Sequence, residues 1–89
     1  MYEIIIPKHI EKKLARYSDI KERFYKKVNL FKQNPSHPSL RFKIYEGVPN
    51  TFEISVNISF RVLLKKIGKK RFEIVDIGYH DILDKYGEK

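Results

Sequence analysis

The sequence predicts an α+β fold, an antiparallel sheet with two N-terminal helices packed on one face. Apolar residues recur with the helical period between residues 10 and 31, and they alternate with polar residues from residue 40 onwards. Short turns separate the alternating segments, and such turns favour an antiparallel meander. The predicted order of elements is β-α-α-β-β-β-β, followed by a short C-terminal helical turn over residues 79–86.

The first strand and the first helix are predicted from the start of the chain. Residues 2–6 (YEIII) are rich in β-branched isoleucine and indicate a strand. Pro7 suits the first turn of a helix, because the amide hydrogen that proline lacks would be unpaired there anyway. Ile10, Leu14 and Tyr17 follow at the spacing of one helical face. A short helix is therefore expected directly after the strand.

A second helix is expected to begin at Asp19 and to end at Asn34. Asp19 and Glu22 have the spacing of a capping box, in which two side chains bond to free amide groups of the first turn. Asn34 precedes Pro35, and the residue before a proline disfavours the helical conformation. The apolar stripe of this helix consists of Ile20, Phe24, Val28 and Phe31.

Four further strands are predicted from the alternation, which runs through residues 40–45, 52–57, 60–65 and 72–77. In the first of them, Arg41 and Lys43 are expected to share one face of the sheet. The opposite face of that strand is formed by Leu40, Phe42 and Ile44. Because a half-apolar sheet needs a cover on its apolar face, the helices are expected there. The other face stays partly polar and carries Arg41, Lys43, Glu53, Ser55 and Arg61.

Length and composition are those of one small folded domain. The 89 residues are expected to form a single domain over residues 1–89, because so short a chain has room for one core. A hydrophobic content of 42% is typical of a folded chain. The absence of cysteine excludes a disulfide framework, a thiolate zinc site and a cysteine nucleophile. No long apolar run and no secretory signal are evident, so a cytoplasmic location is expected.

The chain is strongly basic. Its 19 Lys and Arg residues exceed its 11 Asp and Glu residues, which gives a formal charge of +8. Such an excess favours a polyanionic partner, which can be nucleic acid, an acidic protein or a membrane surface. Charge governs attraction and identifies no reaction, so a basic domain that is merely well solvated is the plain alternative.

Four groups on or beside the partly polar face suit chemistry on a phosphodiester. Arg41, Lys43 and Arg61 supply positive charge, since arginine binds phosphate oxygens in a bidentate manner and lysine acts as a point charge. His80 follows the last strand, and histidine is the side chain that titrates near neutral pH. RNA cleavage without a metal needs a base for the ribose 2′-OH, cations for the phosphate and an acid for the leaving oxygen. No residues have the spacing of metal ligands, so neither a metal nor another cofactor is expected.

Four segments in a fixed order carry a resemblance to a known family. They are residues 37–41 (HPSLR), 52–57 (FEISVN), 60–62 (FRV) and 76–81 (DIGYHD). Together they resemble the RelE/ParE superfamily, the toxins of type II toxin–antitoxin systems. Because a histidine, His80, follows the last strand, the chain is more similar to the RelE and YafQ-like mRNA interferases than to the gyrase-targeting ParE toxins.

The resemblance implies a fold, an activity and partners. The fold would be the RelE-like fold of small microbial ribonucleases. The activity would be a ribosome-dependent mRNA endoribonuclease that inhibits translation by metal-free acid–base cleavage through the 2′-OH. The partners would be a cognate antitoxin, the ribosome and mRNA, with no membrane and no small-molecule cofactor involved.

The resemblance also implies roles for matching residues. Arg61 would hold the scissile phosphate, His80 would act as acid or base, and Lys43 lies where RelE-type toxins place basic catalytic groups. The residues expected to bind RNA are Arg41, Lys65, Tyr79, Asp81 and Tyr86. Asp84 stands where many relatives carry a base-stacking aromatic residue, a role that one of the two tyrosines would then take.

Two other functions compete with the nuclease. One is a ParE-like inhibitor of DNA gyrase, which acts by binding. The other is a non-catalytic basic module that binds RNA or an antitoxin, which the aspartate at position 84 favours. Purely structural roles are also open: Arg61 would be a cross-strand partner of Glu53, Lys43 a solvated strand residue, and His80 a surface residue bonded to Asp81.

Overall fold

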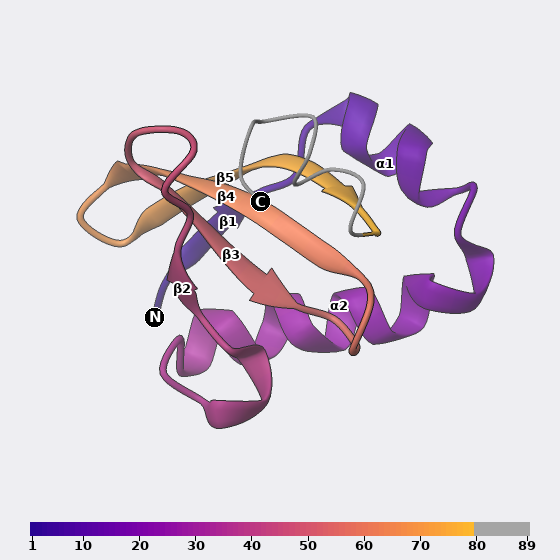
Figure 1. Ribbon diagram of the computed structural model, residues 1–89, viewed down its shortest axis with the longest axis horizontal. Helices are drawn as coiled ribbons and strands as arrows, with labels where there is room; N and C mark the ends of the chain where they lie inside the picture. Colours follow the sequence, from indigo (N-terminus) through magenta and orange to yellow (C-terminus); the bar gives the residue numbers. More distant parts are fainter. Residues whose placement is uncertain (80–89) are drawn as a thin grey trace.

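The computed structural model describes residues 1–79, which form a five-stranded sheet and two α-helices (Figure 1). The elements are β1 (Glu3–Ile5), α1 (Lys8–Leu14), α2 (Ser18–Gln33), the 3₁₀ helix η1 (Pro38–Leu40), β2 (Lys43–Ile44), β3 (Thr51–Ser55), β4 (Arg61–Gly68) and β5 (Arg71–Gly78). The predicted α+β class and the order β-α-α-β-β-β-β are confirmed. The helical turn predicted for residues 79–86 lies, apart from Tyr79, outside the described residues.

The sheet is mixed, with the strand order β1-β5-β4-β3-β2. Strands β2 to β5 form the predicted antiparallel meander, but β1 pairs parallel to β5, with Ile4 opposite Phe72. The prediction of a purely antiparallel sheet is therefore wrong at β1. No tight turn sets the direction of β1, because both helices separate it from the meander, and such long connections permit parallel pairing.

The boundaries of the two helices differ in detail from those expected. Tyr17 lies at the N-cap of α2 rather than on the first helix, and no side chain caps the amide groups there. Asp19 stands inside the first turn, so the predicted capping box is wrong. Its carboxylate still stabilises the helix, because a negative charge in the first turn is attracted to the positive end of the helix dipole. The helix ends before Asn34, as the following proline predicts.

The main core lies between the helices and one face of the sheet. The predicted stripe of α2 is fully buried there, together with Ile10 and Leu14 of α1. At its centre, the Phe31 ring meets the rings of Phe42 and Phe72 edge-on, with centroids 5.3 and 5.1 Å apart. Edge-to-face contacts of this kind add about 0.5–1.5 kcal/mol each beyond the burial of apolar area. The α2 stripe and the sheet thus hold each other in place.

The segment predicted as one strand from residue 40 to residue 45 contains a turn instead. Pro38 begins a 3₁₀ helix, and the His37 ring accepts a hydrogen bond from the Ser39 amide at 3.2 Å. Arg41 ends this helix in the left-handed conformation, with φ 49°. Strand β2 therefore spans two residues only, and its Ile44 is 66% exposed rather than part of the core. Local capping overrides the alternation here, because a proline and a histidine acceptor stabilise a turn.

Candidate functional site

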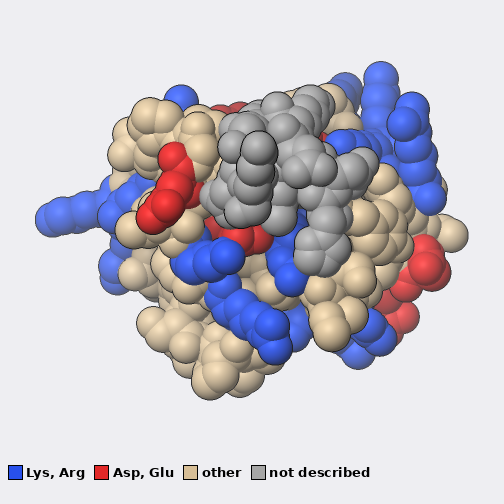
Figure 2. Space-filling model, viewed as in Figure 1, with Lys and Arg blue, Asp and Glu red and all other residues tan. Residues whose placement is uncertain are grey.

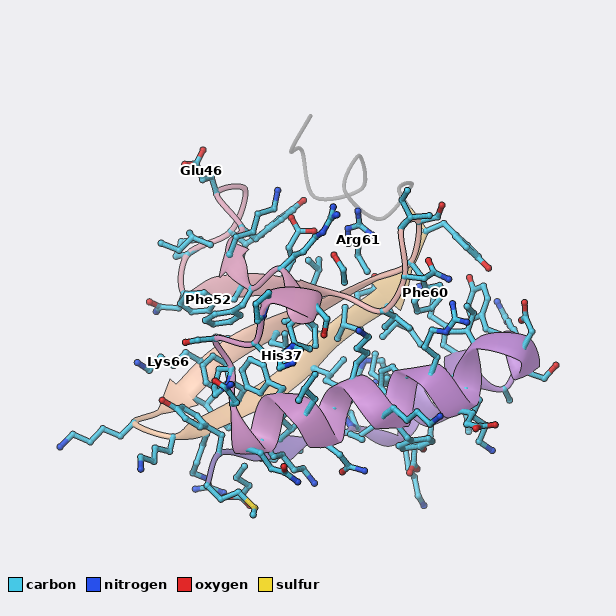
Figure 3. The ribbon with its side chains drawn as sticks, turned by 90° about the horizontal axis from the view of Figure 1, so that it is seen from below. His37, Glu46, Phe52, Phe60, Arg61 and Lys66 are labelled. Carbon is cyan, nitrogen blue, oxygen red and sulfur yellow. The ribbon has the colours of Figure 1, made fainter. Side chains whose placement is uncertain are left out.

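The face of the sheet opposite α2 carries the partly polar set that the sequence predicts, with one exception. Lys43 stands opposite Glu53 across β2 and β3, and Ser55 stands opposite Arg61 across β3 and β4. Figure 3 shows Arg61 on the side of the sheet that faces away from α2. This surface, defined by Lys43, Glu53, Ser55 and Arg61, is the polar face. Arg41 is the exception, because it lies in the turn before β2.

A buried carboxylate joins the two predicted catalytic cations. Glu53 is 2% exposed, and its Oε1 lies 3.1 Å from Lys43 Nζ while its Oε2 lies 3.7 Å from Arg61 Nε. Within the described residues, neither oxygen accepts a well-aligned hydrogen bond, so the contact is mainly one of charge. The Lys43 side chain is 63% exposed and that of Arg61 is 13% exposed. The carboxylate thus draws both cations together on the polar face.

Arg61 is fixed at the start of β4 by the preceding turn. Its Nη1 donates to the Asn57 carbonyl at 2.8 Å, and the Phe60 carbonyl lies 3.4 Å from the same nitrogen. Asn57 holds the turn in shape, because its Oδ1 accepts from the amides of Ser59 and Phe60, both at 2.8 Å. Between residues 1 and 79, no contact uses Nη2 of Arg61. Within this range, the guanidinium therefore combines a structural anchor with an unused donor, Nη2, that suits an anion.

A second ion pair joins α1 to the end of β5. Lys13 Nζ lies 2.7 Å from Oδ1 of Asp76, and the same oxygen accepts from the Ile77 amide at 2.8 Å. Asp76 stands opposite Leu63 of β4, and a register shift near this point marks a β-bulge. Strand β1 pairs with β5 only as far as Glu73, so α1 can reach this part of β5.

Replacing Lys13 by methionine is expected to lower the free energy of unfolding by about 1.5–3 kcal/mol, the value of a hydrogen bond to a charged group. Methionine keeps the length of the side chain and removes the charge, while the Asp76 side chain stays only 7% exposed. Urea unfolding followed by circular dichroism measures the change. Lys26→Met is the matched control, because the Lys26–Glu22 pair is exposed and should be worth less than about 0.5 kcal/mol. Equal losses in the two variants would contradict a structural role for the Lys13–Asp76 pair.

The remaining predicted site residues are placed in different ways. Lys65 lies on the same face of β4 as Arg61 and Leu63, because side chains in a strand point to opposite sides in turn. It is exposed and lies farther along the strand. Tyr79 packs edge-on against Tyr17 and the core residue Phe60, with centroids 5.6 and 5.1 Å apart, so it belongs to the helix-side aromatics. The residues His80, Asp81, Asp84 and Tyr86 lie outside the described residues.

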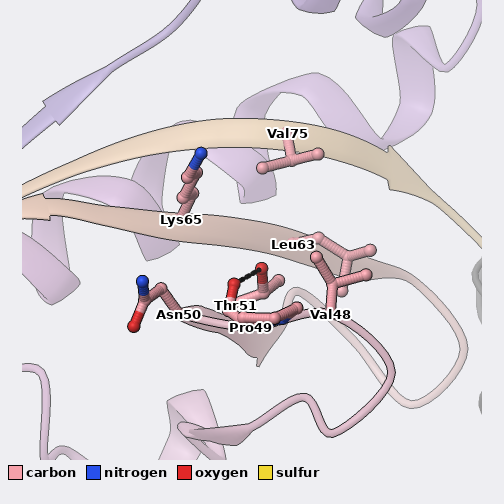
Figure 4. A pocket seen from close by; sticks show the side chains of 7 residues that line it. All are labelled: Val48, Pro49, Asn50, Thr51, Leu63, Lys65 and Val75. Atoms are coloured by element: carbon pink, nitrogen blue, oxygen red, sulfur yellow. Dashed lines mark hydrogen bonds between the residues drawn. The ribbon is translucent and has the colours of Figure 1, made fainter.

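An apolar pocket lies beside the polar face, between the β2–β3 loop and strands β4 and β5 (Figure 4). Its volume is about 390 Å³, and Leu63 and Val75 contribute its apolar wall. Thr51 donates to the Pro49 carbonyl at 3.0 Å and so braces the loop. The lining residues are Val48, Pro49, Asn50, Thr51, Leu63, Lys65 and Val75.

A more polar groove lies at the other end of β3. Its volume is about 410 Å³, and it is bounded by α2, η1 and the turn between β3 and β4. The residues lining it are Lys27, Pro38, Ser39, Arg41, Ser55, Val56, Asn57 and Ile58. Arg41 thus lines a hollow next to the polar face, although it does not lie on the face itself.

Lysine and arginine side chains are numerous on the surface, as expected from the charge of +8 (Figure 2). Among residues 1–79 there is no group of three or more His, Cys, Asp or Glu residues arranged to hold a metal ion. In the same part of the chain, no helix has the length and hydropathy of a membrane span.

Three residues at or near the site are not distinguished by any pattern in the sequence. Lys13 looks like an ordinary solvated helix residue, and Asp76 lies in an apolar strand pattern that gives no hint of an ion pair. Lys27, which lines the groove with Arg41, belongs to the basic side of α2 and is likewise not distinguished by spacing. Each becomes visible only through partners distant in the sequence.

Solved structures share this fold, although no protein-family model matches the chain and no curated protein matches it. The toxin RelE from E. coli superposes with a TM-score of 0.69 at 20% identity, covering 98% of this chain and 92% of RelE. YafQ from E. coli gives a TM-score of 0.70 at 15% identity, covering 93% of this chain and 98% of YafQ. A chain of a YoeB–YefM complex from Staphylococcus aureus gives a TM-score of 0.61 at 12% identity, covering 90% of this chain and 98% of the matched chain. The RelE-like fold implied by the sequence resemblance is therefore confirmed.

Proposed function

We propose that this RelE-like chain is the toxin component of a type II toxin–antitoxin system and an endoribonuclease that cleaves mRNA on the ribosome. The observation that carries the proposal is the arrangement of Arg61 and Lys43 around Glu53 on the polar face. It holds two cations next to each other on the sheet of a fold shared with the toxin RelE. A phosphodiester is the ligand that such a pair of cations suits.

The proposed reaction is an internal transfer at phosphorus. A base removes the proton of the ribose 2′-OH, and the 2′-oxygen forms a bond to phosphorus. The bond from phosphorus to the 5′-oxygen breaks, and an acid protonates that oxygen. The products are a cyclic phosphate on one RNA fragment and a 5′-hydroxyl on the other. Arg61 and Lys43 stabilise the charge on the phosphate, and His80 supplies the base or the acid. DNA lacks the 2′-OH and is not cleaved, and no metal or cofactor takes part.

RNA contacts and partners complete the proposal. Arg41 and Lys65 attract the RNA backbone. Further contacts with the RNA come from Tyr79, Asp81 and Tyr86, which follow the end of β5 and are close in sequence to His80. A cognate antitoxin neutralises the basic toxin in the cytoplasm. Support for such a partner comes from the S. aureus relative, whose structure is a complex of YoeB with YefM.

A brief pulse of expression tests the function directly. We expect primer extension on cellular mRNA to show cuts within reading frames for the wild type and none for His80→Ala, because that variant lacks the proposed acid or base. General acid–base catalysis is worth about 10²–10⁴-fold, so the loss should be clear. His9→Ala is the matched control, since His9 is exposed on α1, and it should cleave as the wild type does.

Each other outcome of this experiment has a distinct meaning. Cuts that persist in His80→Ala would keep the nuclease and transfer the acid or base role to another group. Intact mRNA in arrested cells would contradict the nuclease and favour the gyrase inhibitor, which a DNA-damage response would then reveal. Intact mRNA with normal growth would favour a non-catalytic binding module.

A further inference from the structure

We propose that the groove lined by Lys27 and Arg41 is a second phosphate subsite, which holds the RNA backbone next to the phosphate at Arg61. The inference rests on the proposed function and extends it by giving the substrate a path across the molecule. This hollow of about 410 Å³ is named the Lys27–Arg41 groove. The groove would take part of the backbone of a single-stranded RNA.

The groove carries charge that its own lining does not neutralise. Of the eight residues that line it between residues 1 and 79, two are cationic and none is acidic. On the polar face, by contrast, Glu53 compensates one of the two cations. Lys27 Nζ lies 3.5 Å from the Ser39 carbonyl, and in the described residues Arg41 has no ion pair or hydrogen bond from its side chain. The groove is therefore the more attractive of the two places for a further phosphate.

The backbone of Arg41 is held in a conformation that arginine disfavours. Between residues 1 and 79, Arg41 and Asn50 are the two residues other than glycine with positive φ, at 49° and 56°. Asparagine adopts this conformation readily, whereas arginine does so at a cost in free energy. A glycine would serve the turn better, so the arginine points to a use for its side chain.

The groove continues directly from the surroundings of Arg61. Ser55, which lines the groove, is the cross-strand partner of Arg61. Asn57, which also lines it, accepts the hydrogen bond from Arg61 Nη1. An RNA strand with one phosphate at Arg61 therefore has its next phosphate at the mouth of the groove. Basic grooves that follow the backbone are the usual way of binding single strands.

The groove also offers surface to a base. Ile58 is 80% exposed at the tip of the β3–β4 turn, where it presents an apolar surface beside the two cations. The Asn57 amide uses its oxygen within the turn, and in the part of the chain that the structure describes its nitrogen remains a donor that can face a base edge. Phosphate attraction and base contact thus come from the same hollow.

Fluorescence anisotropy with labelled RNA tests the subsite without requiring cleavage. The probes are a hexanucleotide and a dinucleotide, both with 2′-O-methyl riboses that cannot react. We expect the double variant Lys27→Ala/Arg41→Ala to bind the hexanucleotide about 10-fold more weakly and to flatten the plot of log K against log salt by roughly 1.4, at ~0.7 for each lost cation. The dinucleotide, which has a single phosphodiester, should bind both proteins equally.

A matched control separates the groove from general charge. Lys12→Ala/Arg16→Ala removes the same charge from α1 and the residues after it, both exposed, and should leave most of the hexanucleotide affinity intact. Equal losses in the two double variants, or an equal loss on the dinucleotide, would overturn the subsite. If the wild type neither binds the hexanucleotide nor cleaves mRNA, the proposed function itself fails, and the subsite fails with it.

Arg41→Gly removes the risk that a variant loses binding by unfolding. Glycine accepts φ 49° without strain, so the melting temperature should stay within a few degrees of the wild type while hexanucleotide binding falls. Arg41→Lys keeps the charge, so it should bind the hexanucleotide more tightly than Arg41→Gly and less tightly than the wild type. Unchanged binding by Arg41→Gly would overturn the role of the arginine.

Discussion

Replacing Glu53 by alanine is expected to lower the free energy of unfolding by about 3 kcal/mol, the low end of the cost of removing one partner from a buried ion pair. Glu53 is 2% exposed and lies between Lys43 and Arg61. Without the carboxylate, the guanidinium of Arg61 keeps its charge at 13% exposure and loses its counter-charge. Urea unfolding followed by circular dichroism gives the free energy.

Lys43→Ala serves as the control for this prediction, because it removes the other side of the same contact. The Lys43 side chain is 63% exposed, and in this variant Arg61 Nε still lies 3.7 Å from the Glu53 carboxylate, so the loss should stay below about 1 kcal/mol. The two variants should therefore differ clearly although both break the 3.1 Å contact. If Glu53→Ala costs no more than Lys43→Ala, the buried carboxylate is not what holds the polar face together.

Replacing Arg61 by alanine is expected to lower the rate of mRNA cleavage by about 10²–10³-fold, the usual cost of removing one group that stabilises charge in the transition state. Arg61 is held by the Asn57 carbonyl and Glu53, and this leaves Nη2 for a phosphate oxygen in the described part of the chain. The measurement is the yield of primer-extension cuts after a pulse of expression, beside the growth of the cells. Arg61→Lys should recover little, because lysine lacks the planar set of donors.

The control for Arg61 must exclude loss of folding and general loss of charge. Circular dichroism of purified Arg61→Ala should show a folded protein, since the substitution leaves the main core between the helices and the sheet intact. Arg71→Ala removes an equal charge from an exposed pair with Glu3 and should cleave as the wild type does. A folded Arg61→Ala variant that still arrests growth and cuts mRNA would assign the phosphate contact to other residues.

The polar face shows how far a sequence pattern reaches into a candidate site. Alternation places Glu53, Ser55 and Arg61 on one face, and the structure confirms this, because side chains in a strand point to opposite sides in turn. Alternation fails for Arg41, where Pro38 and the His37 ring favour a 3₁₀ turn. Roles that depend on residues after Tyr79 stay predictions.

Local periodicity in the sequence determined the helices, the meander and the two faces of the sheet, because neighbours along the chain impose these patterns. Only the tertiary structure decided the parallel pairing of β1 with β5 and the ion pair between Lys13 and Asp76. The same holds for the groove between Lys27 and Arg41. These features join segments far apart in the sequence, and their geometry depends on how the helices pack against the sheet, which no local pattern encodes.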